Sequence, residues 1–204
     1  RKYEPESSDV FSNHLHSINY LPDPDQEDAM ALHAEFAKQF EEPLLPHKPH
    51  TNTRDPNRRL KIAFVSPDLR THSVSYFVEP ILKHLDRKEF EVWGILSHTW
   101  RDRKTDHLKA LCDQWIDAGS MSHEQLADRV RQEEIDIFVD LICHSAGSRV
   151  LAFARKPAPV QITMIGMQQT SGIRPTGRSS LRSTRTSFPH SCRQQRTTSR
   201  ASLA

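Results

Sequence analysis

The chain of 204 residues is 36% hydrophobic and 26% charged, with a formal net charge of +2. It has no apolar run near the roughly 18 residues that a membrane-spanning helix needs, so we expect no membrane partner. Residues 173–204 hold seven Arg and no acidic residue, which leaves the first 172 residues at −5, from 21 basic and 26 acidic side chains; the overall charge therefore does not indicate a nucleic-acid partner.

Two helices are predicted in residues 1–42, because apolar residues recur there at spacings of three and four. Pro22 and Pro24 separate the two helices, and Asp25 is placed to cap the second. The pair resembles the last piece of a tetratricopeptide-type repeat array. The apolar positions are Phe11, Leu15 and Ile18 in the first helix and Ala29, Leu32, Phe36 and Phe40 in the second.

Residues 43–58 are rich in Pro, His and polar residues, which predicts a linker. In residues 59–172, β-favouring apolar runs then alternate with helical patterns. This alternation predicts an α/β fold with a mostly parallel, Rossmann-like sheet, whose functional loops follow the C-terminal ends of the strands. The expected strands are Leu60–Val65, Phe90–Leu96, Trp115–Ile116, Ile135–Leu141 and Val160–Ile165, and the expected helices lie in Val74–Leu85, Thr105–Leu111, Ser122–Gln132 and His144–Ala154.

Two features modify these expected helices. Ser122 and Gln125 have the spacing of a capping box, which predicts where the third helix begins. Pro80 lies inside the apolar pattern of the first helix. Because Pro lacks the N–H of the helical hydrogen bond, we expect a kink there.

The composition changes abruptly after Gly172. Of the 32 residues in 173–204, 19 are Arg, Ser or Thr, and no periodic apolar pattern remains. Such a segment cannot bury a core, so we expect it to be disordered. Two interpretations stay open: the segment is translated out of frame, or it is a flexible basic arm that contacts nucleic acid.

The cysteine and histidine pattern indicates neither a metal nor a redox centre. The three cysteines show no C-x-x-C spacing, and the twelve histidines include no H-E-x-x-H motif. We therefore expect no metal and no cofactor, and a reducing, cytoplasmic location. Arg1–Val10 contains neither a signal peptide nor an initiating Met, so the chain is expected to be an internal fragment.

Four segments resemble the catalytic region of the protein O-GlcNAc transferases, including the bacterial and SPINDLY-type members. They are LKIAFVSPDLRTHSVSYFVEPIL at Leu60–Leu82, DRKEFEVWGI at Asp86–Ile95, the run Ile135–Gln161, and Thr170–Gly172. The preceding SNHLHSINYLPDPD and ALHAEFAKQF resemble the family's transition from repeats to catalytic region, so the likeness covers about residues 9–172.

This resemblance implies one Rossmann-like lobe of a two-lobed GT-B glycosyltransferase. The family transfers GlcNAc from UDP-GlcNAc to Ser or Thr hydroxyls of acceptor proteins, with inversion and without a metal. The chain corresponds to the N-terminal catalytic half, and the second lobe, with most of the uridine and diphosphate contacts, has no counterpart in it. We therefore expect a fragment that is inactive alone. The alternatives are a non-catalytic protein-interaction module and a basic-tailed protein that contacts nucleic acid.

Asp68 and His72 are the main candidate catalytic residues, because they follow the first strand and match the family's S-x-D-x-x-x-H pattern. The resemblance implies that Asp68 is a base or a member of a proton relay, that His72 contacts the sugar and acceptor, and that Ser73 and Val74 bind substrate. Asp in S-P-D is also a common turn former, which is the structural alternative for this loop.

His33 matches a cleft-facing catalytic His of the family, although its place beside Leu32 and Phe36 also suits a packing histidine. His144 and Ser145 follow a strand where the family has a G-H-T type turn, and they are expected to bind substrate. Cys143 replaces the Gly of that turn, and a turn that needs a positive φ resists this change. A Cys143–His144 thiol enzyme is disfavoured, because no third group is evident.

The closing motif departs most from the family. The pattern W-x-G-Y-P-x-T-S-G becomes MIGMQQTSG at residues 164–172, which keeps Gly166 and Thr170 but loses the Trp, Tyr and Pro. Gly166 and Thr170 are expected to contact the donor.

Overall fold

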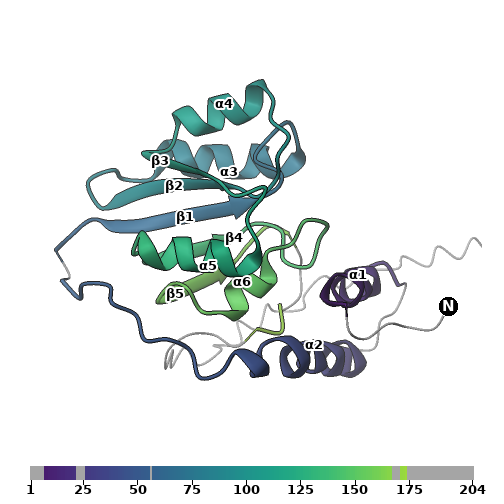
Figure 1. Cartoon of the computed structure of the whole chain (residues 1–204). Helices are drawn as coiled ribbons and strands as arrows, with labels where there is room; N and C mark the ends of the chain where they lie inside the picture. The colour runs from purple at the N-terminus through teal and green to yellow at the C-terminus, as the bar shows by residue number, and fades with distance from the viewer. Residues whose placement is uncertain (1–6, 22–25, 56, 167–170, 174–204) are drawn as a thin grey trace, which may run out of the picture.

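The computed structural model describes residues 7–21, 26–55, 57–166 and 171–173. Its centre is a five-stranded sheet in the order β3-β2-β1-β4-β5, with every pair of neighbours parallel (Figure 1). The predicted Rossmann-like α/β lobe is thus confirmed. The strands are β1 Leu60–Ser66, β2 Phe90–Leu96, β3 Gln114–Asp117, β4 Ile137–Asp140 and β5 Val160–Thr163.

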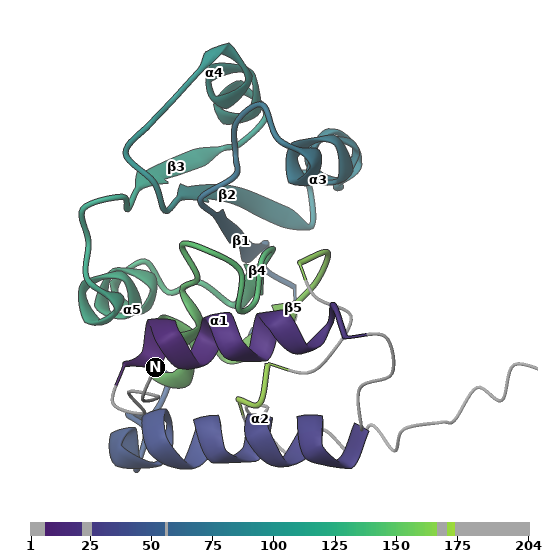
Figure 2. The same cartoon turned by 90° about the vertical axis from the view of Figure 1, so that its right-hand side faces the viewer.

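Helices cover both faces of this sheet (Figure 2). Helices α3 (Ser73–His84) and α4 (Arg103–Ala110) pack on one face, and α5 (His123–Gln132) and α6 (Val150–Ala154) pack on the other. The apolar residues of β1 alternate between the two cores, since Ala63 and Val65 belong to one and Ile62 and Phe64 to the other. This period of two explains why the central strand is a continuous hydrophobic run.

Side-chain caps fix the beginnings of the helices. The predicted capping box of α5 is confirmed, because Ser122 accepts from the Gln125 N–H and the Gln125 side chain accepts from the Ser122 N–H. Helix α4 begins with a second box, between Asp102 and Thr105, which the sequence patterns did not predict. Helix α3 is capped by the imidazole of His72, which accepts a hydrogen bond from the Val74 N–H.

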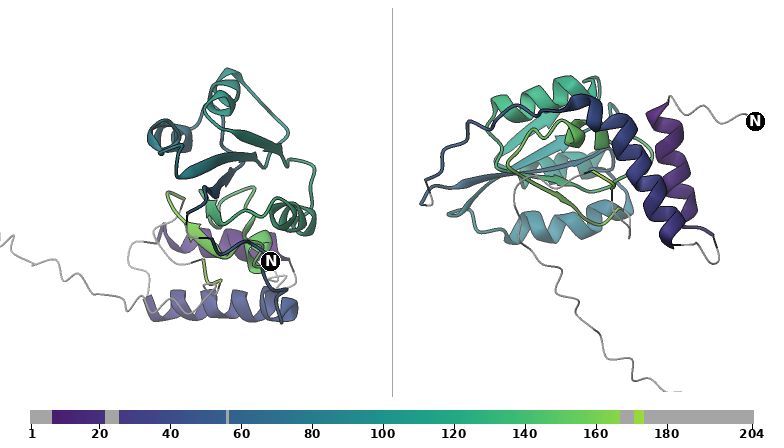
Figure 3. Two further views of the ribbon diagram at one scale, coloured as in Figure 1. Left: turned by 90° about the vertical axis from the view of Figure 1, so that its left-hand side faces the viewer. Right: turned by 90° about the horizontal axis from the view of Figure 1, so that it is seen from below.

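Helices α1 (Ser8–Ile18) and α2 (Gln26–Phe40) lie side by side beneath the lobe (Figure 3). Phe11 makes edge-to-face contacts with Phe36 and Phe40, and the pair packs on Val150 of α6. A buried ion pair between Glu41 and Lys156, 3.5 Å apart, also joins the end of α2 to the segment before β5. Both helices occur as predicted; Asp25 lies outside the described residues, and the repeat origin of the pair stays a prediction.

The predicted linker starts with a 3₁₀ turn at Glu42–Leu44 and then runs along the lobe. Asp136, at the N-terminal end of β4, anchors it by accepting hydrogen bonds from Asn52, Arg58 and the Lys61 N–H. Burial raises the pKa of the Asp136 carboxyl, but these hydrogen bonds, with that of Arg58 the largest, hold it below its ordinary value. The linker is thus fixed at the end of the sheet opposite to the candidate site.

Several element boundaries differ from the sequence prediction, most of all in the helix expected at His144–Ala154, of which only Val150–Ala154 is helical. Strand β5 ends at Thr163 because Ile165 has a φ of 73°, and β4 is shorter than expected because Asp136 serves as the linker anchor. Helix α3 includes Pro80, as expected, and ends at His84, while the kink at Pro80 stays a prediction. Among the described strands, β5 has a neighbour on one side only, and its Val160 and Ile162 are exposed. No helix in the described part of the chain combines the length and apolarity needed to cross a membrane.

Candidate functional site

A cavity of ≈ 870 Å³ lies at the C-terminal ends of β1, β4 and β5. Its volume is within the range of about 300 to 1,000 Å³ that is typical of small-ligand sites. We call this cavity the cleft. Most of the predicted site residues outside α2 meet in it, from loops that are far apart in the sequence. These are Asp68, His72, Ser73, Val74, Ser145 and Gly166.

Asp68 and His72 form the polar centre of the cleft. Asp68 Oδ1 accepts from Arg70 at 2.9 Å, and its Oδ2 lies 3.6 Å from His72 Nδ1. The same Nδ1 is 3.3 Å from the Val74 N–H, so two groups compete for one ring nitrogen. Accepting from Val74 places the imidazole proton on Nε2, whereas a proton on Nδ1 faces Asp68. The loop therefore links the ring's tautomer to the Asp68 carboxylate.

The base of this loop is held by backbone and stacking contacts. The Ser66 hydroxyl accepts from the Asp68 N–H at 2.9 Å, which is a local turn bond of the kind expected for S-P-D. The Arg70 guanidinium lies 5.0 Å from the centre of the Trp100 ring, a cation–π distance. The turn-forming and functional interpretations of Asp68 are thus compatible, because its N–H makes the turn while its carboxylate meets His72.

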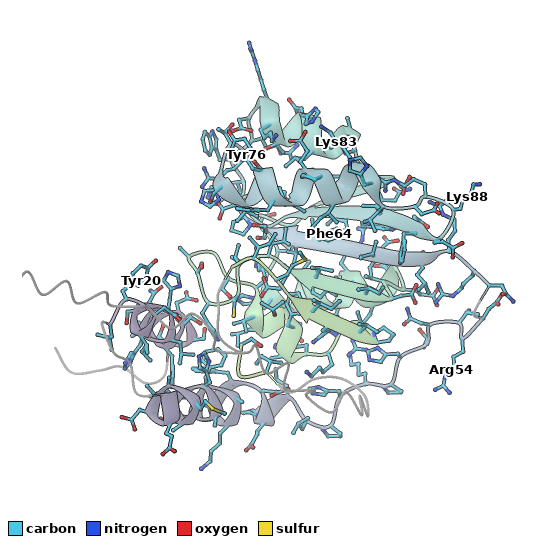
Figure 4. All side chains as sticks on the ribbon, turned by 180° about the vertical axis from the view of Figure 1, so that it is seen from behind. Tyr20, Arg54, Phe64, Tyr76, Lys83 and Lys88 are labelled. Carbon is cyan, nitrogen blue, oxygen red and sulfur yellow. The ribbon has the colours of Figure 1, made fainter. Side chains whose placement is uncertain are left out.

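Helix α1 contributes a wall of the cleft that the sequence analysis missed. His16 and Tyr20 both line it, with their rings 5.5 Å apart and edge to face. Figure 4 shows Tyr20, just beyond α1, and Tyr76, at the start of α3, on the same side of the molecule. The available signal was the i,i+4 spacing of two aromatic rings outside the apolar stripe of α1.

Gly166 lies where the backbone after β5 crosses that after β4. A Cβ at this position would be 2.3 Å from the Ile142 backbone, so no larger residue fits without a shift. The predicted importance of Gly166 therefore has a steric basis in the wall of the cleft. Thr170, its predicted partner in donor binding, lies outside the described residues.

His144 does not line the cleft, and its ring is fully buried. Its Nε2 donates to the Ser171 carbonyl at 2.9 Å, and its Nδ1 accepts from the Ser12 hydroxyl at 3.0 Å. Burial, aided by His33 and His16 and opposed by the Ser171 hydrogen bond, lowers the pKa of His144 to about 4. The ring is thus a neutral link between α1 and the closing segment; it does not line the cleft, and its contact with substrate stays a prediction.

The resemblance predicts a cleft-facing His33, whereas the structure places this residue in the interior, 2% exposed. Its ring lies 5.6 Å from that of His144, and Gly172 packs on its backbone. The packing interpretation fits this position, because the ring is buried beside that of His144. Its catalytic role stays a prediction.

Cys143 occupies the turn before His144 with a φ of 53°, so the predicted need for a positive φ is confirmed although the residue is not Gly. Burial, together with the Asp140 charge, raises the pKa of its thiol to about 12. The buried thiol with its raised pKa therefore does not favour a thiolate nucleophile at Cys143. Within the described ranges, no three His, Cys, Asp or Glu side chains are grouped to hold a metal ion.

Asp140 and His144 should oppose each other in the pH dependence of stability. Burial raises the pKa of Asp140 from its ordinary 3.8 to about 6, against hydrogen bonds from the Ile142 and Cys143 N–H groups. The folded chain then binds more protons than the unfolded chain in this window, so Asp140 makes stability fall as pH rises from about 4 to 6. The depressed pKa of His144 makes stability rise across nearly the same window.

We therefore expect Asp140→Asn to expose the contribution of His144. Between about pH 4 and 6.5, the free energy of unfolding of the variant should rise relative to the wild type by about 3 kcal/mol, which is the equivalent of the Asp140 displacement. Urea titrations of both proteins across this range measure the difference, in which all other groups cancel. A difference that does not change with pH would show that Asp140 is ionised normally in the folded chain.

A second cavity of ≈ 370 Å³ lies across the loop 145–147 from the cleft, and we call it the side pocket. It follows the C-terminal end of β2 and the start of α5, and α1 closes it from the other side. The two cavities share Ser145, Ala146 and Gly147 as a common wall. The side pocket is otherwise lined by Asp9, Ser12, Asn13, Ser97, His123, His144, Ser148 and Arg149.

Comparisons with known proteins agree with this architecture. Residues 12–176 match the family model described as glycosyl transferase family 41. The chain is 32% identical over 176 residues to the probable UDP-N-acetylglucosamine–peptide N-acetylglucosaminyltransferase SPINDLY of Arabidopsis thaliana, covering 84% of this chain and 19% of the relative. The protein of the same name from Oryza sativa is 32% identical over 174 residues, covering 83% and 19%.

A solved structure shows the same fold. A variant of the O-GlcNAc transferase from Thermobaculum terrenum superposes with a TM-score of 0.78 at 37% identity, over 83% of this chain and 33% of that one. The chain thus spans about a fifth of the length of the curated relatives it matches, and a third of the solved chain.

Proposed function

The chain belongs to glycosyl transferase family 41, and we propose that it supplies the N-terminal catalytic lobe of an inverting protein O-GlcNAc transferase. In this proposal GlcNAc passes from UDP-GlcNAc to Ser or Thr hydroxyls of acceptor proteins. The observation that carries it is the cleft, in which Asp68 and His72 lie together beyond the C-terminal ends of the central strands. Parallel α/β sheets bind their ligands at this edge.

The proposed role of His72 follows from its two ring nitrogens. Transfer requires the acceptor hydroxyl to lose its proton as it attacks the anomeric carbon. Imidazole can take that proton on Nε2 only when Nδ1 carries the other, and Nδ1–H then points to Asp68 Oδ2, now 3.6 Å away. Asp68 thus selects the basic tautomer, and a shorter contact in the substrate complex would strengthen it.

When Nδ1 instead accepts from the Val74 N–H, Nε2–H becomes a donor toward the cleft. That tautomer suits a hydrogen bond to a sugar or phosphate oxygen. A single residue can therefore serve the acceptor before transfer and the leaving group after it. Arg70, bound to Asp68 and stacked on Trp100, keeps the carboxylate oriented in both cases.

The donor diphosphate accumulates negative charge during transfer, and stabilising it requires cations or N–H donors. We propose that most of these groups come from a second lobe, as the family resemblance implies, and that the described lobe alone does not turn over. The two described cysteines are free, which is consistent with the proposed cytoplasmic location.

A chimera tests this proposal. Residues 9–173 of this chain would replace the matching third of the parent of the solved Thermobaculum terrenum enzyme. We expect the chimera to transfer labelled GlcNAc from UDP-GlcNAc to a Ser/Thr-rich protein, while the 204-residue chain alone gives no signal above a no-enzyme control. A chimera that folds, as judged by circular dichroism, but transfers no sugar would contradict the proposed function. Transfer by the chain alone would contradict the need for a second lobe.

A further inference from the structure

The loop between β1 and α3, which ends in His72, is attached to the loop between β2 and α4. The backbone N–H of Thr71 donates to Oδ2 of Asp102 at 2.8 Å, across 31 positions of the sequence. Arg70 also stacks on Trp100 of that second loop. The residue immediately before His72 is thus held by a carboxylate from a different part of the chain.

The two oxygens of the Asp102 carboxylate have separate partners. Its Oδ1 accepts from the Thr105 N–H at 3.0 Å and caps helix α4, and the Thr105 hydroxyl accepts from the Asp102 N–H in return. A helix cap needs only one acceptor oxygen, so the second oxygen can hold Thr71 without weakening the cap. Hydrogen bonding to Thr71 is the largest of the interactions that keep the pKa of Asp102 well below its ordinary value.

Helix α4 also holds the chain on the other side of His72. Helix α3 follows His72 directly, and its Glu79 accepts hydrogen bonds from Lys104 and His107 of α4, the latter at 2.9 Å. The two helices lie on the same face of the sheet (Figure 2). The segments before and after His72 are therefore both attached to α4.

The ring of His72 is held loosely by its own contacts. Its Nδ1 lies 3.3 Å from the Val74 nitrogen and 3.6 Å from Asp68 Oδ2, and the side chain is 40% exposed. The position of the ring therefore depends on the backbone that carries it. A displacement of about 1 Å in an active site can lower a rate by about 10²-fold, so a hydrogen bond to the preceding residue matters for transfer.

We propose that Asp102 is a positioning residue for His72 in the transfer reaction. Through Thr71 its carboxylate fixes the backbone from which the imidazole reaches the cleft, although Asp102 itself does not line the cleft. This inference rests on the proposed function, in which Nε2 of His72 takes the proton of the acceptor hydroxyl. It makes the residue that caps α4 a part of the site.

Asp102→Asn removes the hydrogen bond to Thr71 and keeps the cap. The single amide oxygen of Asn can accept from the Thr105 N–H, and its NH₂ group then faces the Thr71 N–H as a second donor. In the chimera we expect kcat to fall by about 10-fold, while KM for UDP-GlcNAc changes by less than about 2-fold.

Thr105→Val is the matched control. It removes the hydroxyl that returns a hydrogen bond to Asp102, but leaves the Thr105 N–H and the bond between Asp102 and Thr71. This variant should lower the urea midpoint at least as much as Asp102→Asn does, without lowering the rate. A loss of rate as large as that of Asp102→Asn would show that the stability of α4 alone is responsible, and would overturn the inference.

Combination with His72→Asn shows whether Asp102 acts through His72. If it does, Asp102→Asn should cause no further loss of rate in that background, because the group that it positions is already gone. An equal loss in both backgrounds would give Asp102 a role independent of His72 and overturn the inference. A normal rate for Asp102→Asn alone would overturn it as well.

Amide hydrogen exchange in the complete 204-residue chain separates this inference from the proposed function. Asp102→Asn should speed exchange of the Thr71 and Val74 N–H groups by about 5-fold or more, because the first loses its acceptor and the second depends on the position of the His72 ring. Thr105→Val should leave both unchanged. Faster exchange at both positions, with a chimera that transfers no sugar, would keep Asp102 as the residue that positions His72 and contradict the proposed function. Unchanged exchange at Val74 would overturn the inference even if the chimera is active.

Discussion

Replacing His72 by Ala in the chimera is expected to lower the rate of GlcNAc transfer by about 10²-fold or more, the usual range for a general acid–base group. The effect should appear in kcat, because the imidazole acts on the proton that moves in the transition state. Helix α3 should also lose its cap, since His72 accepts from the Val74 N–H, at a cost of about 1 kcal/mol in the free energy of unfolding.

His72→Asn separates the two effects. Asn is among the best N-cap residues, so this variant should keep α3 intact and still lose the ring nitrogen needed for proton transfer. Rates and urea midpoints are measured for both variants. A normal rate for His72→Asn, with a loss only in His72→Ala, would reduce His72 to a helix cap.

Asp68→Asn completes this set, because it keeps the shape of the side chain and removes its charge. If Asp68 selects the basic tautomer of His72, the rate should fall and its dependence on pH should change. The turn hydrogen bond to the Ser66 hydroxyl is donated by the backbone N–H of Asp68, so the substitution leaves it in place. A loss of stability without a loss of rate would return Asp68 to the turn-forming role.

The largest expected loss of stability follows removal of Lys156. Its ammonium lies 3.5 Å from Glu41 Oε1, and the two side chains are 3% and 0% exposed. Lys156→Met would leave the Glu41 carboxylate buried beside an apolar chain, and breaking such a pair costs about 3–5 kcal/mol. The free energy of unfolding from urea titration at neutral pH measures this loss, which is a large share of the stability of a typical domain.

Two controls define the cause. Lys48→Met makes the same chemical change on the exposed linker, and should alter stability by less than about 0.5 kcal/mol. The double variant Lys156→Met with Glu41→Leu removes both charges and should recover most of the loss, because a buried pair is close in stability to a well-packed apolar one. A double variant as unstable as Lys156→Met would show that packing, and not the loss of the ion pair, causes the instability.

Local patterns were enough to predict most of the lobe. The box of Ser122 and Gln125 depends on residues three apart, and the β1 run depends on neighbours, so both could be read from the sequence. The capping box of Asp102 and Thr105 was not predicted, because Thr stands where such a box usually has Glu or Gln. Strand β5 was predicted too long because the chain turns at Ile165, with its positive φ, and brings Gly166 against the backbone of Ile142, a contact between distant segments.

The candidate site divides in the same way. Asp68 and His72 lie four residues apart on one loop, so the motif could place them together. His144 could not be assigned, because its partner Ser12 is 132 positions away, and the ring is buried by the docking of α1 and α2. The same docking brings His16 and Tyr20 to the cleft, and no local pattern contains that information.

The two edges of the sheet give the chain an uneven tendency to aggregate. Strand β3 carries Asp117, which pairs with Arg101, so a second strand that approaches this edge meets a charge. Strand β5 instead presents exposed Val160 and Ile162 and has no strand beyond it among the described residues. β-branched residues on an unguarded edge act as a template for another chain. At high concentration, copies of this lobe should therefore associate through β5, while the face that carries the cleft remains open.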